Sequence, residues 1–421
     1  MALRIIFINR FFYPDHSGTS QMLSDLAFAL AERGLEQTII TSRLRYDGPN
    51  EELLASTTIR GVMVHRVWTS RFGRKNLLGR AMDYLTFYLT AAWLLGRLAR
   101  RGDIVVAKTD PPMLSVLAWP VARVRGAKLV NWLQDVFPEV AERFGRGTPV
   151  SMVAYRGLRF LRDQTLKHAD MNVAVGERMA EHVRSLGVAA DRIVMIPNWA
   201  DGTFVRPVAR ADNPLRRAWG LGDDFVVGYS GNLGRAHDID TFLAAMSAVH
   251  QGMEPKTAAE PQTARRVRWL FIGGGALIED LHRQLVARGM DGVVFQPYAP
   301  REDLALSLSA ADVHLVSLRP EMEGLVVPSK IYGIAAAGRP AIFIGDADGE
   351  IARVIARYDF GRSVTQGDGP GLARAILDLA EQPDVCRAMG ERARQAFEKD
   401  FDKPAAADRW QRLLAEVAAK A

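Results

Sequence analysis

Cysteine is almost absent from this sequence of 421 residues, in which Cys386 stands alone. A single cysteine excludes an internal disulfide and any metal site built from several thiolates, and it favours a reducing compartment. No stretch reaches the roughly 18 consecutive apolar residues of a membrane-spanning helix. Residues Met1 to Ile8 also lack the basic, apolar and small-residue regions of a secretory signal peptide. We therefore expect a cytoplasmic protein.

Two ligand-binding patterns are missing as well. No basic run is interleaved with aromatic residues, so we expect no nucleic-acid partner. No G-x-G-x-x-G follows the first apolar run, and the second run ends in Thr41-Ser42-Arg43 without an acidic residue to hold a ribose, which argues against a nicotinamide dehydrogenase. The net charge of +6 favours anionic ligands of another kind.

The apolar runs that are present alternate with helical patterns from end to end, which is typical of α/β proteins with parallel sheets covered on both faces. The length and the 48% hydrophobic content suffice for two cores. In the first half we predict strands at 4–8, 37–41, 62–67, 103–107, 128–132, 171–175 and 192–196. In the second half we predict strands at 225–229, 268–272, 293–295, 313–317 and 341–344.

An irregular stretch that contains Pro207 and Pro214 separates the two series of strands. We therefore predict one domain over 1–205 and a second over 206–401, with a C-terminal helix in 402–421 that packs back on the first. Residues 251–265, rich in Ala, Glu, Pro and Gln, read as an exposed loop insertion.

One predicted helix is unusually aromatic over residues 84–95 and is followed by Arg97, Arg100 and Arg101. An apolar face that ends in cations suits a helix lying on an anionic membrane surface. A buried core helix with a solvated end would show the same pattern, so both interpretations stay open.

Open α/β sheets bind ligands at the carboxyl ends of their strands, so we searched the loops that follow strands. Gly18 lies between the first strand and its helix, where free N–H groups favour anions. In the second half, Asn232, Gly234, Arg235 and His237 follow the strand at 225–229. Arg235 offers a permanent cation to a phosphate, and His237 could assist when protonated.

Two more loops of the second half are candidates. Gly273-Gly274-Gly275 would let a nucleotide lie close to the backbone at Gly274, although a structural turn explains this loop nearly as well. Further on, Pro328 and Ser329 fit the start of a helix, which places Lys330 in the first turn. A cation there opposes the helix dipole unless an anion is also present, so Lys330 is a candidate anion ligand.

The motifs FYPDHSGTSQ, NWLQDVFPE, IPNW, YSGNLGRAHDID, FIGGG, VPSKIYG and IAAAGRP together resemble family 4 of the retaining glycosyltransferases. The similarity is to the branch of colanic acid and other bacterial surface polysaccharide enzymes. The resemblance implies the GT-B architecture, in which two Rossmann-like α/β domains face a central cleft. It also implies a UDP- or GDP-sugar donor held mostly by the second domain, with Arg235 and Lys330 on the diphosphate.

Other positions are assigned through the same resemblance. Donor contacts are implied for Gly324, Leu325 and Val326, beside those of the glycine-containing loops. The paired glutamates of the family are not reproduced, and Glu323 or Glu321 is the candidate substitute for the first of them. Gln134-Asp135 stands where many relatives carry His-Asp, which makes Asp135 a candidate for contact with the acceptor.

The resemblance implies a retaining transferase that acts on a lipid-linked saccharide at the cytoplasmic membrane face. We expect no cofactor and no metal site, although Asp346-Ala347-Asp348 matches the D-x-D pattern of metal-dependent transferases. Two alternatives stay open: a nucleotide-sugar epimerase of the same architecture, and a non-catalytic nucleotide-sugar sensor.

Overall fold

The computed structural model describes residues 3–15, 17–46, 52–73, 77–144, 149–253 and 266–420. The chain divides into two compact units, here called unit 1 and unit 2. Unit 1 comprises Met1–Asn198, Gly324–Val326 and Lys403–Ala421, and unit 2 comprises Trp199–Glu323 and Val327–Asp402. Most of the loop insertion expected at 251–265 lies outside the described residues.

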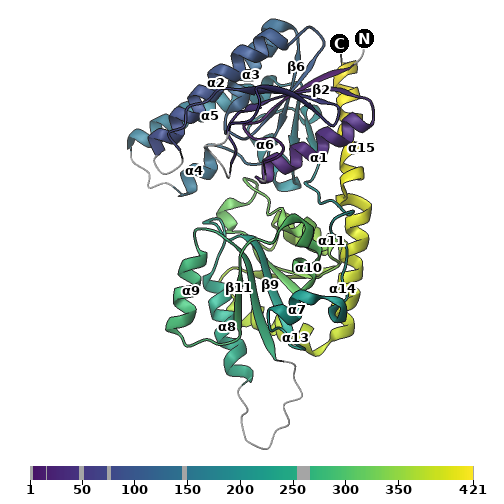
Figure 1. Ribbon diagram of the computed structural model, residues 1–421. Coiled ribbons are helices and arrows are strands. Elements are labelled where there is room, and N and C mark those ends of the chain that lie inside the picture. Colours follow the sequence, from purple (N-terminus) through teal and green to yellow (C-terminus); the bar gives the residue numbers. More distant parts are fainter. Residues whose placement is uncertain are drawn as a thin grey trace, which may run out of the picture. The chain divides into compact units, whose positions relative to one another are not determined.

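Unit 1 is built on an eight-stranded sheet with the order β3-β4-β2-β1-β5-β6-β7-β8 (Figure 1). Its strands pair in parallel, except that β3 runs antiparallel to β4. The strands are β1 (Arg4–Ile8), β2 (Glu36–Ser42), β3 (Ser56–Ile59), β4 (Val62–Val67), β5 (Ile104–Lys108), β6 (Lys128–Trp132), β7 (Met171–Ala174) and β8 (Ile193–Met195).

Helices cover both faces of this sheet. One face packs on a core that includes Ile6, Phe87 and Leu129. On the other face Trp132 meets Trp410 of the C-terminal helix, with ring centroids 4.7 Å apart. The helices of unit 1 are α1 (Gly18–Glu32), α2 (Leu77–Leu98), α3 (Leu114–Arg125), α4 (Glu139–Phe144), α5 (Pro149–His168), α6 (Glu177–Ser185) and α15 (Lys403–Ala419).

Unit 2 is built on a six-stranded, fully parallel sheet with the order β11-β10-β9-β12-β13-β14. Its strands are β9 (Phe225–Asn232), β10 (Val267–Gly274), β11 (Val293–Gln296), β12 (Val313–Ser317), β13 (Ala341–Gly345) and β14 (Gly361–Thr365). The helices are α7 (Pro214–Ala218), α8 (Asp240–Met253), α9 (Ile278–Ala287), α10 (Leu304–Ser309), α11 (Lys330–Ala336), α12 (Glu350–Tyr358), α13 (Gly369–Glu381) and α14 (Pro383–Ala396).

Strand β9 lies inside this sheet and is buried on both faces. Val227 and Tyr229 point into the larger core, whereas Val226 points into the smaller core on the opposite face. This alternation follows from the two-residue period of a strand. Tyr229 lies in the carboxyl-terminal half of β9, close in sequence to the loop that carries Arg235.

The core interpretation of the aromatic helix holds for one side of α2, and the membrane interpretation stays a prediction for the other side. Phe87 and Leu95 are fully buried in the core of unit 1, as a core helix requires. Leu85, Leu89 and Trp93 are 47%, 59% and 63% exposed on the other side. Among the described residues, no helix combines the length and the apolarity needed to cross a bilayer.

Candidate active site

The carboxyl ends of β9 and β10 form a pair of closely packed glycine loops in unit 2. A Cβ atom at Gly273 would lie 2.5 Å from the carbonyl oxygen of Gly231, and one at Gly275 would lie 2.5 Å from the backbone of Leu233. Both glycines also have positive φ, at 123° and 131°. Close backbone packing therefore requires these two glycines, which favours the structural turn for them. The donor contact expected at Gly274 stays a prediction.

Lys330 reaches from the start of α11 to the end of β9. Its Nζ lies 3.7 Å from the centre of the Tyr229 ring and donates a hydrogen bond to the Tyr229 hydroxyl. That hydroxyl in turn donates to the backbone carbonyl of Asn232 at 3.1 Å. Because the tyrosine proton is committed to a carbonyl, its oxygen is left to accept from the lysine.

No carboxylate of the described residues compensates the charge of Lys330. Among the described residues no carboxylate forms an ion pair with Lys330. Burial lowers the pKa of its amine well below the ordinary value. A bound anion would favour the protonated amine again, and the contact of Lys330 with the donor diphosphate stays a prediction.

His237 lies beside this lysine but is not a second cation. Its Nδ1 donates to the carbonyl oxygen of Ser317 at 2.6 Å. Burial, and then the nearby charge of Lys330, lower the pKa of His237 to about 3. These surroundings favour the neutral ring in the protein without a bound anion. The donor contact expected of His237 stays a prediction.

Arg235 is exposed in the turn after β9, close in sequence to exposed Asn232 and partly buried Gly234. No ion pair ties Arg235 down among the described residues. A free guanidinium at a strand end can rotate toward a phosphate. The donor contacts of Arg235, Asn232 and Gly234 stay predictions.

Glu323 lies at the N-terminus of helix α12, which the sequence motif did not indicate. Its Oε2 accepts a hydrogen bond from the backbone N–H of Glu350 at 3.0 Å, so it caps the N-terminus of α12. A Cβ atom at Gly349 would lie 2.3 Å from Glu323 Oε1, so only glycine admits the carboxylate there. Glu321, the other candidate, is exposed and lies 3.9 Å from Arg319. Sugar contact by either glutamate stays a prediction.

The remaining candidates from this stretch belong to unit 1 or have local partners. Gly324, Leu325 and Val326 are grouped with unit 1, and the donor contacts implied for them stay predictions. Asp346 accepts from the backbone N–H of Asp348, and Asp348 pairs with Arg353 through two 2.8 Å bonds. Both carboxylates of the D-x-D pattern are thus engaged close by.

Unit 1 carries a buried lysine that sequence reasoning missed. Lys108 ends β5, is 2% exposed and donates to the carbonyl oxygen of Thr19 at 2.8 Å. Its Nζ lies 3.8 Å from the centre of the Trp132 ring. Asp110 accepts from the Thr19 hydroxyl at 2.9 Å. The one available signal was a lysine that closes a fully apolar strand.

Asp135 belongs to the same group of charges. Desolvation of the carboxyl by the surrounding protein, and then the negative charge of Asp110, raise the pKa of Asp135 to about 6. The positive charge of Lys108 acts in the opposite direction. The side chain keeps an exposed surface, so it can meet a ligand. The adjacent Gln134 exchanges two hydrogen bonds with Asn198, at 3.0 and 3.1 Å. A carboxyl that titrates near neutrality can accept a proton or a hydrogen bond from a hydroxyl.

Gly18 begins α1 behind its N-cap, Ser17, whose hydroxyl accepts from the backbone N–H of Ser20 at 3.4 Å. A Cβ atom at Gly18 would meet nothing within 4 Å. Packing therefore does not require glycine at this position, and the ligand contact expected of it stays a prediction.

Known proteins share both the sequence and the fold. Residues 17–199 match the Glycosyl transferase 4-like domain, and residues 224–382 match the Glycosyl transferases group 1 family. The probable glycosyltransferase WbjE of Pseudomonas aeruginosa is 30% identical over 313 residues, which cover 74% of each chain. The putative colanic acid biosynthesis glycosyl transferase WcaI of Escherichia coli strain K12 is 26% identical over 66% of this chain and 62% of its own.

Solved structures share the two-sheet architecture. A sucrose-phosphate synthase of Thermosynechococcus elongatus aligns with a TM-score of 0.78 at 18% identity, over 99% of both chains. HepE of Anabaena, solved with UDP and glucose, aligns with a TM-score of 0.71 at 15% identity, over 98% of this chain and 100% of its own. The architecture is therefore GT-B, as the sequence motifs implied. Together with the two matched domains and the relative at 30% identity, it places the chain in the group 1, family 4 glycosyltransferases.

Proposed function

We propose that this enzyme transfers a sugar, with retention of configuration, from a UDP- or GDP-sugar to a lipid-linked saccharide during surface polysaccharide synthesis. The observation that carries the proposal is Lys330, a largely buried cation that has an aromatic partner and no counter-charge. The diphosphate of a nucleotide sugar supplies the missing anion. The polysaccharide context is supported by WcaI, whose name assigns it to colanic acid biosynthesis.

In this proposal Lys330 and Arg235 hold the donor diphosphate. The bond between the sugar and the β-phosphate breaks, a bond from the acceptor oxygen to the same sugar carbon forms, and the acceptor proton passes to the leaving phosphate. Negative charge grows on that phosphate during the reaction, and a preorganised cation stabilises it more in the transition state than in the ground state. Asp135 orients the acceptor hydroxyl.

The donor test uses the full chain and a panel of UDP-sugars and GDP-sugars. We expect one donor to raise the melting temperature and to be hydrolysed slowly without an acceptor. An epimerase would instead convert the donor to its epimer, which chromatography of the sugar released by mild acid detects. If no nucleotide sugar raises the melting temperature, the proposal fails.

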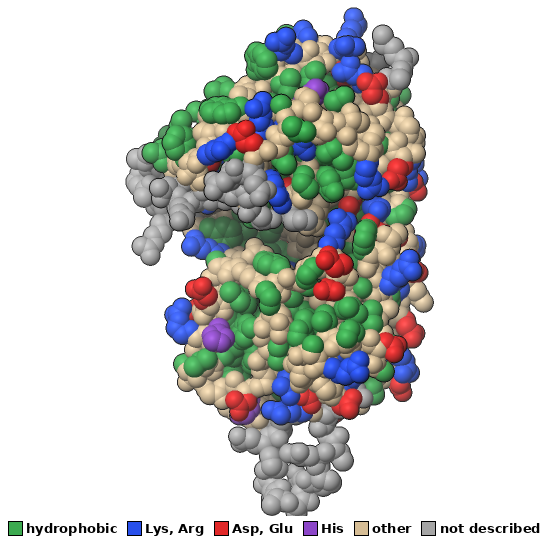
Figure 2. All heavy atoms as spheres, in the orientation of Figure 1, with side chains coloured by type: hydrophobic (Ala, Val, Ile, Leu, Met, Phe, Trp, Pro, Cys, Tyr) green, Lys and Arg blue, Asp and Glu red, His purple; other side chains and the backbone are tan. Residues whose placement is uncertain are grey.

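The proposal includes attachment to an anionic membrane through α2. The exposed side of this helix carries large apolar residues three or four positions apart, which places them on one face; they are Leu78, Met82, Leu85, Leu89 and Trp93. The guanidinium of Arg97 lies 4.9 Å from the centre of the Trp93 ring, so a cation borders this face. Figure 2 shows hydrophobic side chains beside Lys and Arg side chains on the drawn surface of unit 1.

The membrane test is sedimentation with vesicles that contain phosphatidylglycerol at low salt. We expect the parent to sediment and the triple variant Leu85→Ser, Leu89→Ser, Trp93→Ser to stay in the supernatant. The matched control is Val286→Ser, which removes a 68% exposed apolar side chain from unit 2. Substitution of Arg97, Arg100 and Arg101 should weaken binding in a salt-dependent manner. Equal sedimentation of parent and triple variant would exclude this surface.

A further inference from the structure

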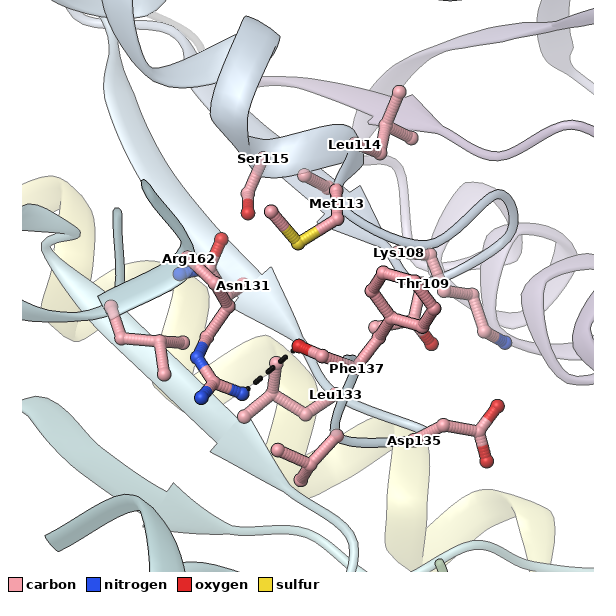
Figure 3. Close-up of a pocket in the computed structure, with 13 residues that line it drawn as sticks. Lys108, Thr109, Met113, Leu114, Ser115, Asn131, Leu133, Asp135, Phe137 and Arg162 are labelled. Carbon is pink, nitrogen blue, oxygen red and sulfur yellow. Dashed lines mark hydrogen bonds between the residues drawn. The ribbon is translucent and has the colours of Figure 1, made fainter. Parts of the chain in front are cut away.

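A small pocket opens in unit 1 at the carboxyl ends of β5 and β6. Figure 3 shows the side chains of Met113, Ser115 and Asn131 at one end, whereas the charged ends of Lys108 and Asp135 point away at the other. The space open to the centre of a water-sized group is about 30 Å³. One water needs roughly 10–15 Å³ on this measure, so the pocket has room for more than a single water.

The amide of Asn131 is held in one orientation by its neighbours. Asn172 donates from its Nδ2 to two backbone carbonyls, those of Leu166 at 2.9 Å and Arg192 at 3.1 Å. Carbonyls only accept, so Asn172 must present its oxygen to Asn131, whose Nδ2 donates to it at 2.8 Å. The Oδ1 of Asn131 is left as a buried acceptor without a hydrogen-bond partner.

Ser115 also presents an acceptor to the pocket. The single hydroxyl proton of Thr165 is donated to the carbonyl oxygen of Arg162 at 2.7 Å. The 3.1 Å bond between Ser115 and Thr165 must therefore use the proton of Ser115. The free lone pair of the Ser115 oxygen remains, so two acceptors line one end of the pocket.

A donor for a ligand carbonyl comes from Thr109. Its hydroxyl oxygen accepts from the backbone N–H of Gln134 at 3.2 Å, and its proton has no acceptor among the described residues. Arg162 does not make the pocket cationic, because Glu139 and Asp163 neutralise its guanidinium. Apart from Lys108 and Asp135, the rest of the wall is apolar and includes Met113, Leu133 and Leu166.

We propose that this pocket is a specificity subsite for an acetamido substituent on the acceptor sugar. The amide N–H of that group satisfies Asn131 Oδ1, its carbonyl accepts from Thr109, and its methyl group contacts the apolar wall. A hydroxyl group in place of the acetamido group would leave the apolar wall in contact with water and would not fill the pocket. The inference rests on the proposed transfer to a saccharide, because it names a feature of that acceptor.

The test compares methyl 2-acetamido-2-deoxy-β-D-glucopyranoside with methyl β-D-glucopyranoside as ligands of the full chain in the presence of UDP. We expect the acetamido ligand to bind about tenfold more tightly, because only it satisfies the buried acceptor. In saturation-transfer NMR its acetyl methyl should receive the strongest transfer. Asn131→Leu should abolish the preference, so that the ratio of the two affinities falls to about one, and it should leave the affinity for the glucoside unchanged.

Two variants separate this role from a loss of folding. Thr109→Val removes the hydroxyl that donates to the ligand carbonyl, at a partly exposed site, and should lower the preference by a few-fold. Asn9→Leu is the matched control, because Asn9 is another fully buried asparagine with an unpartnered Oδ1, and it is not among the residues that line this pocket. It should keep the tenfold preference while its melting temperature reports any general damage.

Equal affinities for the two ligands, or no saturation transfer to the acetyl methyl group, would mean that the pocket holds water only. Either result would overturn the subsite. A preference that survives Asn131→Leu would do the same. Donor stabilisation by nucleotide sugars, measured on the same proteins, does not depend on Asn131. Its loss would count against the proposed transfer alone.

Discussion

Each unit of this enzyme places a lysine against an aromatic ring, and the two lysines differ in what surrounds them. Lys330 in unit 2 lies 3.7 Å from the centre of the Tyr229 ring, and Lys108 in unit 1 lies 3.8 Å from that of Trp132. Burial lowers the pKa of both amines. Among the described residues, carboxylates act only on Lys108, and those of Asp110, Asp135 and Asp25 oppose the shift.

This difference separates two uses of a buried cation. Lys108 is compensated inside its own unit and also satisfies a backbone carbonyl, so it supports the local structure. Lys330 is uncompensated, so its environment improves only when an anion arrives. The following changes test that contrast, beginning with the largest expected effect.

Lys330→Ala should lower the transfer rate constant at saturating donor by a factor of about 10² to 10³, the usual effect of removing one preorganised donor. The fold should stay intact and its free energy of unfolding should equal or slightly exceed that of the parent, because an uncompensated buried amine is lost. The measurements are steady-state kinetics and urea unfolding. Lys403→Ala, which removes a lysine that also begins a helix, is the control. Near-parent turnover by Lys330→Ala would move the diphosphate site to the Gly273 loop.

Arg235→Ala should cost less, on the order of tenfold in rate, because solvent screens an exposed guanidinium. Combined with Lys330→Ala, the loss should be smaller than the product of the two single losses if both cations hold one diphosphate. A double-mutant cycle on the rate constant measures this coupling. Fully independent effects would show that the two side chains hold different groups.

Lys108→Met should destabilise the protein by about 1–3 kcal/mol, because the carbonyl of Thr19 loses its hydrogen-bond donor. Lys330→Met is the matched comparison and should not destabilise. Urea unfolding of both variants at pH 7 gives the two free energies. If both substitutions lower the free energy of unfolding by the same amount, the contrast between the two lysines is wrong.

Asp135→Asn should change how stability depends on pH. The folded-state pKa of Asp135 is raised to about 6, above the ordinary value of 3.8. The native state therefore holds a proton that the unfolded state has lost, so this contribution to stability falls as pH rises from about 4 to about 6. Asp135→Asn should lack that fall. Parallel pH profiles of the two proteins in chemical unfolding would contradict the assignment.

A chelator should have the smallest effect of all. If Lys330 and Arg235 hold the diphosphate, transfer in the presence of EDTA should equal transfer in its absence, within the error of the rate assay. A strict loss of activity that magnesium or manganese restores would instead make Asp346 and Asp348 candidate ligands, despite their local partners.

The strands that the sequence pattern does not predict are two polar edge strands. Every predicted strand is present. Most of these are continuous apolar runs, as is typical of strands buried on both faces, and the partly exposed edge strands β8 and β11 are also apolar in sequence. The two strands that were missed, β3 and β14, lie at the outer edges of their sheets. Their residues are exposed or only partly buried, so no apolar run distinguishes them from loops.

The residues of the candidate site also divide into those that the sequence indicates and those that it does not. Lys330 could be selected from sequence alone, because a cation in the first turn of a helix is a local misfit that the chain itself displays. Tyr229 and Lys108 were missed, since Tyr229 meets Lys330 across 101 positions and Lys108 meets Thr19 across 89. Contacts between residues so far apart in the sequence leave no local pattern.

By itself, the sequence determined the two α/β halves, the family and the loops that carry cations, because these depend on local periodicity and on residues close together in the chain. Only the tertiary structure decided which cation is compensated, that burial lowers the pKa of His237, and that Glu323 caps a helix. Each of these depends on burial and on partners brought together by sheet formation, and the free energy of a charge is set by those surroundings rather than by its neighbours in sequence.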